Sequence, residues 1–403
     1  MSGLMIRRAR VLTLDGPGGP RRGGALRDLG VRVVCDVRCE GGRVAAIGEN
    51  LRVQSGDHEV NADGCVLMPG FVDCHTHLCW AGSRVGEWEQ RLAGATYLDI
   101  LAAGGGIMST VRAVRAASTA ELAELLLGRL RCALATGTTT IEIKSGYGLD
   151  TATELKMLRA IDLAASQWPG TVVKTACIGH AIDPDEPNAV ERTVCETLDA
   201  VHAEFPGLAI DAYCEKGAWS VRDCERLFER AADLGHPCRV HADQFNALGM
   251  TAIAVERGFA SVDHLEASTN EGLQELAESG THGVMLPCSG FHLDQRYASG
   301  RQFVDLGGAL AIATNCNPGS APCSSMPMTI ALATRYLGLT PSEAIACATV
   351  NATNVLGLTD RGRIAAGCRA DLILLSLQDE RELAHSFGMN PVESVIVAGE
   401  IVW

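Results

Sequence analysis

Short apolar segments alternate with amphipathic segments along most of the chain, from about residue 64 to about residue 320. This alternation is typical of strand–helix units arranged around a parallel sheet. Eight of the apolar segments have the length of a strand, and eight strands suit a closed barrel. The predicted barrel strands are 65–78, 138–145, 172–180, 209–215, 238–242, 261–265, 283–287 and 309–314.

Helices are predicted between these strands, at 121–135, 153–165 and 221–232. In the first of them, four leucines recur at helical spacing and are expected to share one side of the helix. They are Leu122, Leu125, Leu126 and Leu130. A further helix is predicted to begin at Thr340, because this threonine N-cap is followed by a proline and, three residues on, by Glu343.

Both ends of the chain show a different pattern. Short strands separated by clusters of glycine and proline are predicted before residue 50, and strand-like segments return after Gly362. The two ends are expected to pair into one small β domain. The chain is therefore predicted to consist of a small β domain from residues 1–63 plus 362–403 and a barrel from residues 64–361.

Composition and charge narrow the class of protein. Hydrophobic residues make up 47% of the 403 residues and charged residues 20%, which is ordinary for a folded globular chain. The formal net charge of −14 argues against a nucleic-acid or anionic-membrane partner, because phosphates require a basic patch. No stretch reaches the ~18 apolar residues of a membrane-spanning helix, so no membrane span is expected.

Sixteen cysteines are scattered along the chain without a CxxC pair. Disulfide frameworks belong to small secreted domains, and zinc fingers require paired spacings. The N-terminal residues are too polar for a signal peptide. We therefore expect mostly reduced, buried thiols in a cytoplasmic protein.

Two histidines end the first predicted barrel strand, in the run Pro69-Gly-Phe-Val-Asp-Cys-His-Thr-His77. Residues two apart in a strand share a face, so His75 and His77 are both expected to point into the barrel at its carboxyl end. Two imidazoles held in this way can bind one Zn²⁺ or iron ion. The HxH pattern alone is a weak signal, because two polar histidines also meet at a strand end by coincidence.

Three other strand ends strengthen the metal hypothesis. His180 ends the third predicted strand, His241 lies in the fifth and His264 in the sixth. Five of the eleven histidines therefore fall at the end of a barrel where active sites of this fold lie. The other six are expected to be structural or solvated.

Longer motifs resemble those of the imidazolonepropionases, a family of the amidohydrolase superfamily, in order and over nearly the whole chain. The motifs are the HxH run, Ala81-Gly-Ser-Arg84, Ala103-Gly-Gly-Gly-Ile107, Ser109-Thr-Val-Arg112, Glu142-Ile-Lys-Ser-Gly-Tyr-Gly-Leu149, Cys214-Glu-Lys-Gly217, His241-Ala-Asp-Gln244, Ser261-Val-Asp-His-Leu-Glu266 and Cys316-Asn-Pro-Gly319. The resemblance implies an α/β fold, a distorted (β/α)₈ TIM barrel with a small β-sandwich domain built from both termini. It implies hydrolytic ring opening of 4-imidazolone-5-propanoate to N-formimino-L-glutamate in histidine degradation, with one Zn²⁺ or Fe³⁺ per subunit. Homodimers are common among similar enzymes.

The resemblance also assigns roles to individual residues. It gives metal binding to His75, His77 and His241. It gives substrate contact to Arg84, Tyr147, His180, Gln244, Asn317, Gly319 and Ser320. These roles make chemical sense, because Arg84 offers a bidentate fork to the propanoate carboxylate and Gln244 offers a donor and an acceptor to the edge of the ring.

One position departs from the family. The family has an aspartate at the end of the eighth strand that binds the metal and carries a proton, whereas this chain has Asn315 there. Asn315 offers a neutral oxygen as a weak metal ligand and cannot hold a proton at neutral pH. The sequence therefore predicts a slowed enzyme unless another catalytic group, for which His264 is the candidate, replaces the carboxylate. His180 or His264 is expected to donate a hydrogen bond to the developing oxyanion.

Three other functions remain open at this stage. An amidohydrolase for another small cyclic amide or amidine would share the barrel and the histidines, but a substrate without a carboxylate would leave Arg84 and Tyr147 unused. A non-catalytic metal- or ligand-binding barrel would explain Asn315. A thiol hydrolase based on Cys214 is disfavoured, because this residue and the two after it alternate between the faces of a strand.

Overall fold

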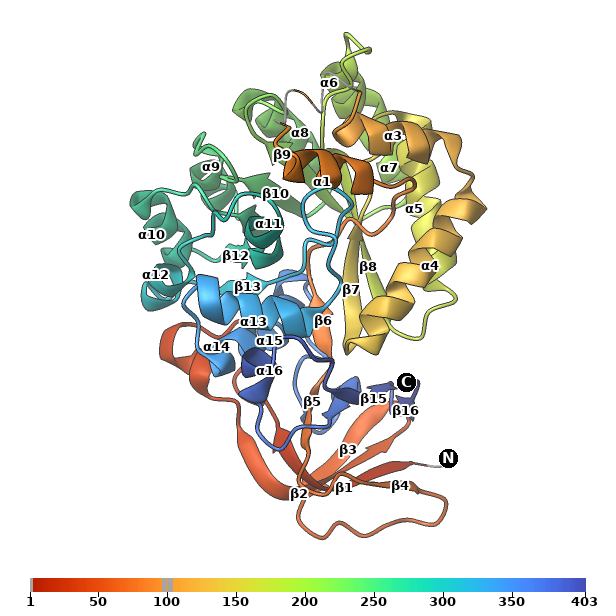
Figure 1. The fold of residues 1–403 in the computed structure, drawn as a ribbon, viewed down its shortest axis with the longest axis vertical. Coiled ribbons are helices and arrows are strands. Elements are labelled where there is room, and N and C mark those ends of the chain that lie inside the picture. Colours follow the sequence, from red (N-terminus) through yellow and green to blue (C-terminus); the bar gives the residue numbers. More distant parts are fainter. Residues whose placement is uncertain (1–2, 96–98, 100–103) are drawn as a thin grey trace.

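The computed structural model describes residues 3–95, 99 and 104–403. It contains two eight-stranded sheets, one above the other in Figure 1. The upper sheet is parallel and its strands pair in chain order, as expected for a barrel of successive strand–helix units. Its strands are β6 (Phe71–Asp73), β7 (Thr138–Lys144), β8 (Thr171–Gly179), β9 (Ala209–Cys214), β10 (Cys238–Ala242), β11 (Ser261–His264), β12 (His282–Met285) and β13 (Leu310–Ile312).

The structure confirms seven of the predicted barrel strands and corrects the first. The predicted strand 65–78 is divided at Gly70: Val66–Pro69 (β5) pairs in the small sheet, and only Phe71–Asp73 (β6) belongs to the barrel. A Cβ at Gly70 would lie 2.3 Å from the Oγ1 of Thr139, so only glycine lets the chain pass this closely to β7. The hydrophobic pattern did not reveal the division, because both halves are buried.

The barrel closes through the segments that follow its first and last strands. The His77 N–H donates to the carbonyl of Cys316 at 3.0 Å, and the Asn315 N–H donates to the carbonyl of His75 at 3.0 Å. Thr76 and Cys316 form a parallel bridge. These backbone bonds join the HxH motif to the loop after β13 and hold both at the carboxyl end of the barrel.

Helices cover the outside of the barrel (Figure 1). The predicted helix 121–135 is confirmed as α4 (Thr119–Ala135), which starts at a capping box between Ser118 and Glu121. Of the four leucines predicted to share its buried side, Leu125 is the exception, since it is 43% exposed. Its position at the edge of the apolar stripe accounts for this exposure.

The other predicted helices are also present. The predicted start at Thr340 is confirmed, because a capping box joins Thr340 to Glu343. The segments 153–165 and 221–232 form α5 and α8. The remaining helical elements described include a 3-10 helix at Gly23–Arg27 and a π-helical turn at Thr193–Thr197. Besides α4, the described α-helices are α1 (Val85–Leu92), α3 (Ile107–Ala116), α5 (Thr151–Ala165), α6 (Ala189–Arg192), α7 (Leu198–Glu204), α8 (Val221–Asp233), α9 (Met250–Glu256), α10 (Asn270–Glu278), α11 (Pro287–His292), α12 (Gly300–Asp305), α13 (Met326–Tyr336), α14 (Pro341–Cys347), α15 (Val350–Val355) and α16 (Glu382–His385).

The second sheet joins the two ends of the chain, as predicted (Figure 1). It has a hydrophobic core of its own, which includes Ile6, Val37 and Leu372. Positive φ angles of 56° at Arg8 and 55° at Val34 coincide with irregular pairing between its first two strands, which marks β-bulges. Along the path β16-β15-β14-β5-β1-β2-β3, with β4 beside β1, the strands are β16 (Glu400–Ile401), β15 (Val392–Val397), β14 (Leu372–Leu375), β5 (Val66–Pro69), β1 (Leu4–Leu12), β2 (Val31–Glu40), β3 (Arg43–Gly48) and β4 (His58–Asn61).

The thiols and the surface agree with a folded globular chain. All sixteen cysteines are free, and twelve of them are buried. Within the described ranges, no helix has the length and apolar character needed to cross a bilayer.

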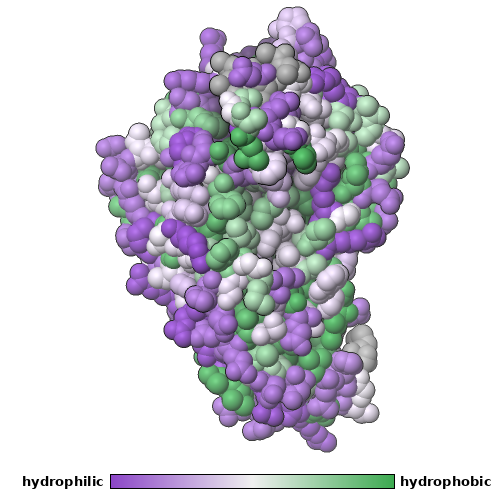
Figure 2. Space-filling model, in the orientation of Figure 1, coloured by the Kyte–Doolittle hydropathy of each residue, from purple (hydrophilic) through white to green (hydrophobic). Residues whose placement is uncertain are grey.

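On the face shown in Figure 2, hydrophobic residues are visible near α1, where Val85, Trp88 and Leu92 are 68%, 45% and 69% exposed. This helix also borders the cavity at the end of the barrel.

Candidate active site

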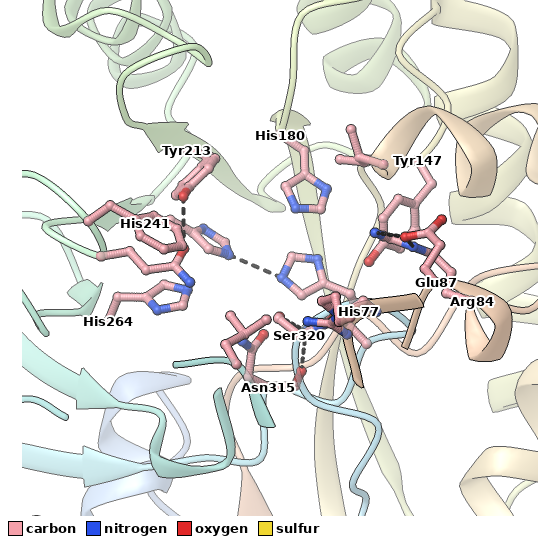
Figure 3. A pocket seen from close by; sticks show the side chains of 17 residues that line it. His77, Arg84, Glu87, Tyr147, His180, Tyr213, His241, His264, Asn315 and Ser320 are labelled. Carbon is pink, nitrogen blue, oxygen red and sulfur yellow. Dashed lines mark hydrogen bonds and ion pairs between the residues drawn. The ribbon is translucent and has the colours of Figure 1, made fainter. Parts of the chain in front are cut away.

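A cavity of about 230 Å³ lies at the carboxyl end of the barrel (Figure 3). All seven predicted substrate contacts line it, together with three of the predicted metal ligands, His77, His241 and Asn315, and with His264. His75 is completely buried next to these histidines. The cavity is lined by His77, Arg84, Glu87, Arg91, Ile107, Tyr147, His180, Tyr213, His241, Gln244, Phe245, His264, Leu293, Asn315, Asn317, Gly319 and Ser320.

The first histidine of the HxH pair is oriented by a buried carboxylate. The Nδ1 of His75 lies 2.6 Å from the Oδ2 of Asp263. Because the Nδ1–H donates to this carboxylate, the lone pair of the ring is on Nε2. That Nε2 is buried and has no hydrogen-bond partner among the described residues. A buried acceptor without a partner is suited to bind a metal ion or a water molecule.

His241 is oriented in the same way from the opposite strand. It lies on β10, and its Nδ1 is 2.9 Å from the Oδ1 of Asp211. Its Nε2 then points at the Nε2 of His77, at a distance of 3.1 Å (Figure 3). Two unprotonated imidazole nitrogens that face each other so closely repel, unless a proton or a cation lies beside both.

The protonation of these rings favours the metal. Burial and the charge of Lys144 hold the pKa of His75 well below its usual range, and burial and His180 do the same for the pKa of His77. Burial also lowers the pKa of His241. Neutral imidazole is the form that binds metal ions. The three histidines therefore fit the metal ion that the sequence predicts.

His264 adds a fourth imidazole to this cluster. Ring nitrogens of His75, His241 and His264 lie within 4.8 Å of one another. The Nδ1 of His264 lies 3.2 Å from each carboxylate oxygen of Glu266. His264 has a φ of 93°, which is strained for a residue other than glycine and is held by the surrounding structure. The end of β11 thus turns sharply to bring this ring to the cavity.

A network of five buried charges lies behind the histidines. Asp211 accepts a hydrogen bond from Lys144 at 2.6 Å, and Asp263 accepts one from Arg239 at 2.8 Å, in addition to their bonds from histidines. Glu142 accepts from both cations. The three carboxylates outnumber the two cations by one. This excess negative charge favours a cation at the imidazoles in front of the network.

Replacing Asp263 by Asn is expected to weaken metal binding about 10–100-fold, because the carboxylate orients the His75 ring. The same change leaves Arg239 without one of its buried partners and is expected to cost about 3–5 kcal/mol of the free energy of unfolding. Competition with a chelator and urea unfolding measure the two effects. Asp233→Asn, an exposed change on α8, is the matched control. Unchanged metal affinity in D263N would contradict the orienting role.

His180 and Tyr147 form a second aromatic pair in the cavity. The His180 ring stacks on His77, with ring centroids 4.6 Å apart, and its Nδ1 donates to the carbonyl of Gly146 at 2.9 Å. Burial and the nearby His241 lower the pKa of His180 to about 3, so its Nε2 presents a hydrogen-bond acceptor. Burial raises the pKa of Tyr147, whose phenol therefore keeps its proton and is a donor.

Asn315, which the resemblance aligns with a metal-binding aspartate, lies in the loop after β13. Its φ is 54°, a left-handed conformation that asparagine and aspartate tolerate. Its Nδ2 donates to the Oγ of Ser289 at 2.7 Å. The side-chain oxygen is therefore the polar atom that this residue can offer to the cavity, as a neutral ligand.

Asn317 organises the loop that carries three of the predicted contacts. Its Oδ1 accepts from the N–H groups of Gly319 at 2.9 Å and Ser320 at 2.8 Å. Its Nδ2 donates to the Asn315 carbonyl and the Ser320 Oγ, each at 2.7 Å. Since both amide hydrogens are used in the loop, Asn317 shapes the wall of the cavity. A Cβ at Gly319 would lie 2.5 Å from Nη1 of Arg84, so glycine permits the guanidinium to approach.

Arg84 lies at the start of α1 with two charged neighbours that the sequence analysis missed. Its Nε and Nη2 donate to one oxygen of Glu87 at 2.8 and 2.7 Å. Arg91 also lines the cavity, and its Nη2 donates to the carbonyl of Gly319 at 3.3 Å. Glu87 and Arg91 follow Arg84 by three and seven residues. This helical spacing was the signal that could have found them.

Gln244 follows β10 and faces the cavity. Its Oε1 accepts a hydrogen bond from the hydroxyl of Tyr213 at 2.8 Å, which leaves Nε2 as the donor for a ligand. Tyr213 was also missed by the sequence analysis. It follows Asp211 by two residues on β9, so the period of a strand places both side chains on the inner face.

Comparison with known proteins gives the family. The sequence pattern of the amidohydrolase family matches residues 66–402. The imidazolonepropionase of Herpetosiphon aurantiacus is 46% identical over 404 residues, which cover 96% of this chain and 95% of the relative. The imidazolonepropionase of Symbiobacterium thermophilum is 44% identical over 399 residues, which cover 96% of this chain and 94% of the relative.

Solved structures agree with the fold. The 5-methylcytosine deaminase from Klebsiella pneumoniae, liganded with 5-fluorocytosine, superposes with a TM-score of 0.75 at 15% identity. The match covers 99% of this chain and 97% of the deaminase, and at this identity it shows the fold alone. The relatives that match nearly the whole chain at 44–46% identity identify the family within this fold. The chain therefore belongs to the imidazolonepropionases of the amidohydrolase family.

Proposed function

We propose that this chain hydrolyses 4-imidazolone-5-propanoate to N-formimino-L-glutamate, a ring-opening step of histidine degradation. The observation that carries the proposal is the division of the cavity: Arg84 and Tyr147 lie at one side and the imidazole cluster at the other (Figure 3). The substrate is divided in the same way, into an anionic propanoate arm and a ring that water must attack. Relatives named imidazolonepropionase that match nearly the whole chain support this assignment.

We propose that His75, His77 and His241 hold one Zn²⁺ or Fe³⁺ per subunit, with the side-chain oxygen of Asn315 as a weak additional ligand. The unpaired Nε2 of His75 and the facing nitrogens of the other two histidines support this set. When bound, such an ion supplies Lewis-acid chemistry, which polarises a carbonyl oxygen and lowers the pKa of water.

The side chains around the cavity orient the substrate. Arg84 and Tyr147 donate to the propanoate carboxylate, which is the geometry that a guanidinium fork prefers. Gln244 donates from Nε2 to an acceptor of the ring. His180 presents an acceptor Nε2, so it receives a ring N–H. This assignment differs from the prediction that His180 donates to an oxyanion, and it leaves that role to His264.

Proton transfer is the step for which this site lacks a carboxylate. Water loses a proton as it attacks the ring carbonyl, and the leaving ring nitrogen must gain one. Asn315 can neither accept nor return that proton, and the amide is held in place by Ser289. We therefore propose a competent binding site whose turnover is slower than that of a relative with aspartate at this position.

The test is a ring-opening assay with purified, Zn²⁺-loaded protein and 4-imidazolone-5-propanoate. The expected result is formation of N-formimino-L-glutamate above the spontaneous rate. No product from the wild type, beside an active Asn315→Asp variant, would reduce the natural chain to a binding protein. No product from either protein would contradict the proposed reaction.

Replacing Arg84 by Gln is expected to raise KM about 10–100-fold, because the bidentate, charge-assisted hydrogen bonds to the carboxylate are lost. The kcat is expected to change less, since Arg84 lies away from the ring carbonyl. Steady-state kinetics measure both constants. Arg131→Gln, an exposed change on α4, removes the same charge elsewhere. A KM equal to that of the wild type would rule out carboxylate binding by Arg84.

The organisation of the chain and its assembly complete the proposal. We propose a small β domain from residues 1–63 plus 362–403, to which the structure adds β5 (Val66–Pro69) from the start of the predicted barrel range 64–361, and a barrel that begins at Phe71. We also propose a cytoplasmic homodimer, and light scattering tests the mass. We propose a small carboxylate-bearing substrate as the partner, and the net charge of −14 argues against nucleic acid or an anionic membrane.

A further inference from the structure

The guanidinium that is proposed to bind the substrate carboxylate already holds a carboxylate of this chain. One oxygen of Glu87 accepts from both Nε and Nη2 of Arg84, at 2.8 and 2.7 Å. Both side chains line the cavity, and they are only 14–16% exposed. Figure 3 shows the pair at the edge of the cavity, next to Tyr147. Glu87 therefore occupies the fork that a propanoate group would use.

The second oxygen of Glu87 has a separate anchor. It accepts from the backbone N–H of Gly106, the residue before α3, at 3.1 Å. Glu87 thus keeps a hydrogen bond on this oxygen even when the other leaves Arg84. The Glu87 carboxylate therefore stays hydrogen-bonded to Gly106 when a ligand binds the Arg84 guanidinium.

The charge balance at this corner leaves room for a second anion. Arg91 lines the cavity beside Arg84, and burial, with the charge of Arg84, lowers the pKa of Arg91. Among the described residues that line this corner of the cavity, two guanidinium groups lie beside one carboxylate, that of Glu87, which gives these residues one excess positive charge. An incoming carboxylate neutralises this excess, whereas a neutral ligand does not.

We propose that Glu87 is a specificity-determining residue, which occupies the Arg84 fork in the free protein and yields it only to a ligand that brings its own carboxylate. A neutral ring cannot replace the ion pair, so it gains nothing from Arg84. A propanoate group replaces one carboxylate by another, and the freed Glu87 oxygen turns to solvent while Arg91 compensates the added charge. This inference deepens the proposed function and rests on its carboxylate-bearing substrate.

The experiment compares two imidazole probes by calorimetry, on proteins of equal metal content. The probes are 3-(imidazol-4-yl)propanoate and 4-propylimidazole, which share the ring and differ in the carboxylate. The variants are Glu87→Gln, which removes the competing charge, and Glu89→Gln as the matched control. Glu89 lies on the same helix, is exposed and is not among the residues that line the cavity.

The expected result is that E87Q binds the propanoate probe about tenfold more tightly, the equivalent of one charge-assisted hydrogen bond released from competition. Binding of 4-propylimidazole is expected to stay unchanged, and E89Q is expected to change neither. For turnover of 4-imidazolone-5-propanoate, E87Q is expected to lower KM by a larger factor than it changes kcat. A residue that merely supported the fold would not produce this split.

Two other outcomes are distinguishable. If the wild type prefers the propanoate probe but E87Q binds it no more tightly, Glu87 does not compete for Arg84 and this inference alone is overturned. Weaker binding by E87Q overturns it too, because Glu87 would then position the fork for the ligand. If the wild type binds both probes equally, carboxylate recognition fails, and the proposed substrate class fails with it.

Discussion

Replacing Asn315 by Asp is expected to raise the kcat of ring opening about 10²–10⁴-fold, the usual contribution of a general acid–base group. An amide cannot take the proton from the attacking water or return it to the leaving nitrogen, whereas a carboxylate can do both. The site accepts the change, because the two side chains have the same shape and a φ of 54° suits both. The hydroxyl of Ser289, which now accepts from the amide, can rotate and donate to the carboxylate.

The measurement is kcat for the wild type and N315D at equal, independently measured metal content. This condition separates proton transfer from metal retention, since a carboxylate is also a stronger ligand than an amide. Asn188→Asp adds the same charge at an exposed position and should leave kcat unchanged. Equal kcat in the wild type and N315D would show that another group, for which His264 is the candidate, already transfers the proton.

Replacing His77 by Ala is expected to abolish stoichiometric metal binding and to reduce ring opening to the spontaneous rate. His77 provides one of the two nitrogens that face each other at 3.1 Å, and its loss leaves only two of the three proposed imidazole ligands with the weak amide oxygen. His264 lies near His75 and His241 but is not a proposed ligand, so metal retained in H77A would assign it that role. Among the three proposed ligands, His77 is the best choice for this test. It has no buried carboxylate partner in the described structure, so its removal leaves no uncompensated charge.

Elemental analysis and the ring-opening assay measure the two effects. Removal of the metal from the wild type with a chelator should produce the same loss, and added Zn²⁺ should restore activity in the wild type but not in H77A. His385→Gln, an exposed histidine on α16, is the control and should retain metal and activity. Full metal content in H77A would contradict the proposed ligand set.

The barrel and its histidines were predictable because both depend on local periods. Alternation of apolar strands and amphipathic helices indicates strand–helix units, and residues two apart in a strand share a face. His75 and His77 were therefore expected to point together, and although β6 ends at Asp73, the bridge from Thr76 to Cys316 continues the extended chain through both. His180, His241 and His264 had to join them, because parallel strands of a barrel bring their carboxyl ends to the same side. Leu125 shows the limit of prediction from periodicity, since the sequence does not decide whether an apolar residue at the edge of the apolar stripe is buried or exposed.

Other features depend on contacts between distant parts of the chain. His75 and Asp263 are 188 residues apart, and no local pattern pairs them. The division of the first predicted strand at Gly70 depends on its approach to β7, which no apolar run encodes. His180 donates its Nδ1–H to the carbonyl of Gly146 in the loop after β7, and this bond between two strand ends is what leaves its Nε2 as an acceptor.

The order of residue types along the chain by itself determined the strand–helix repeat, the strand ends that carry imidazoles and the amide at position 315. Only the tertiary structure decided which nitrogen of each ring is free, which buried charges stand behind the rings and that Glu87 already occupies Arg84. The physical reason is that local periodicity sets the direction of a side chain. Its partner, its protonation and its access to a ligand are set by whatever the folded chain packs against it.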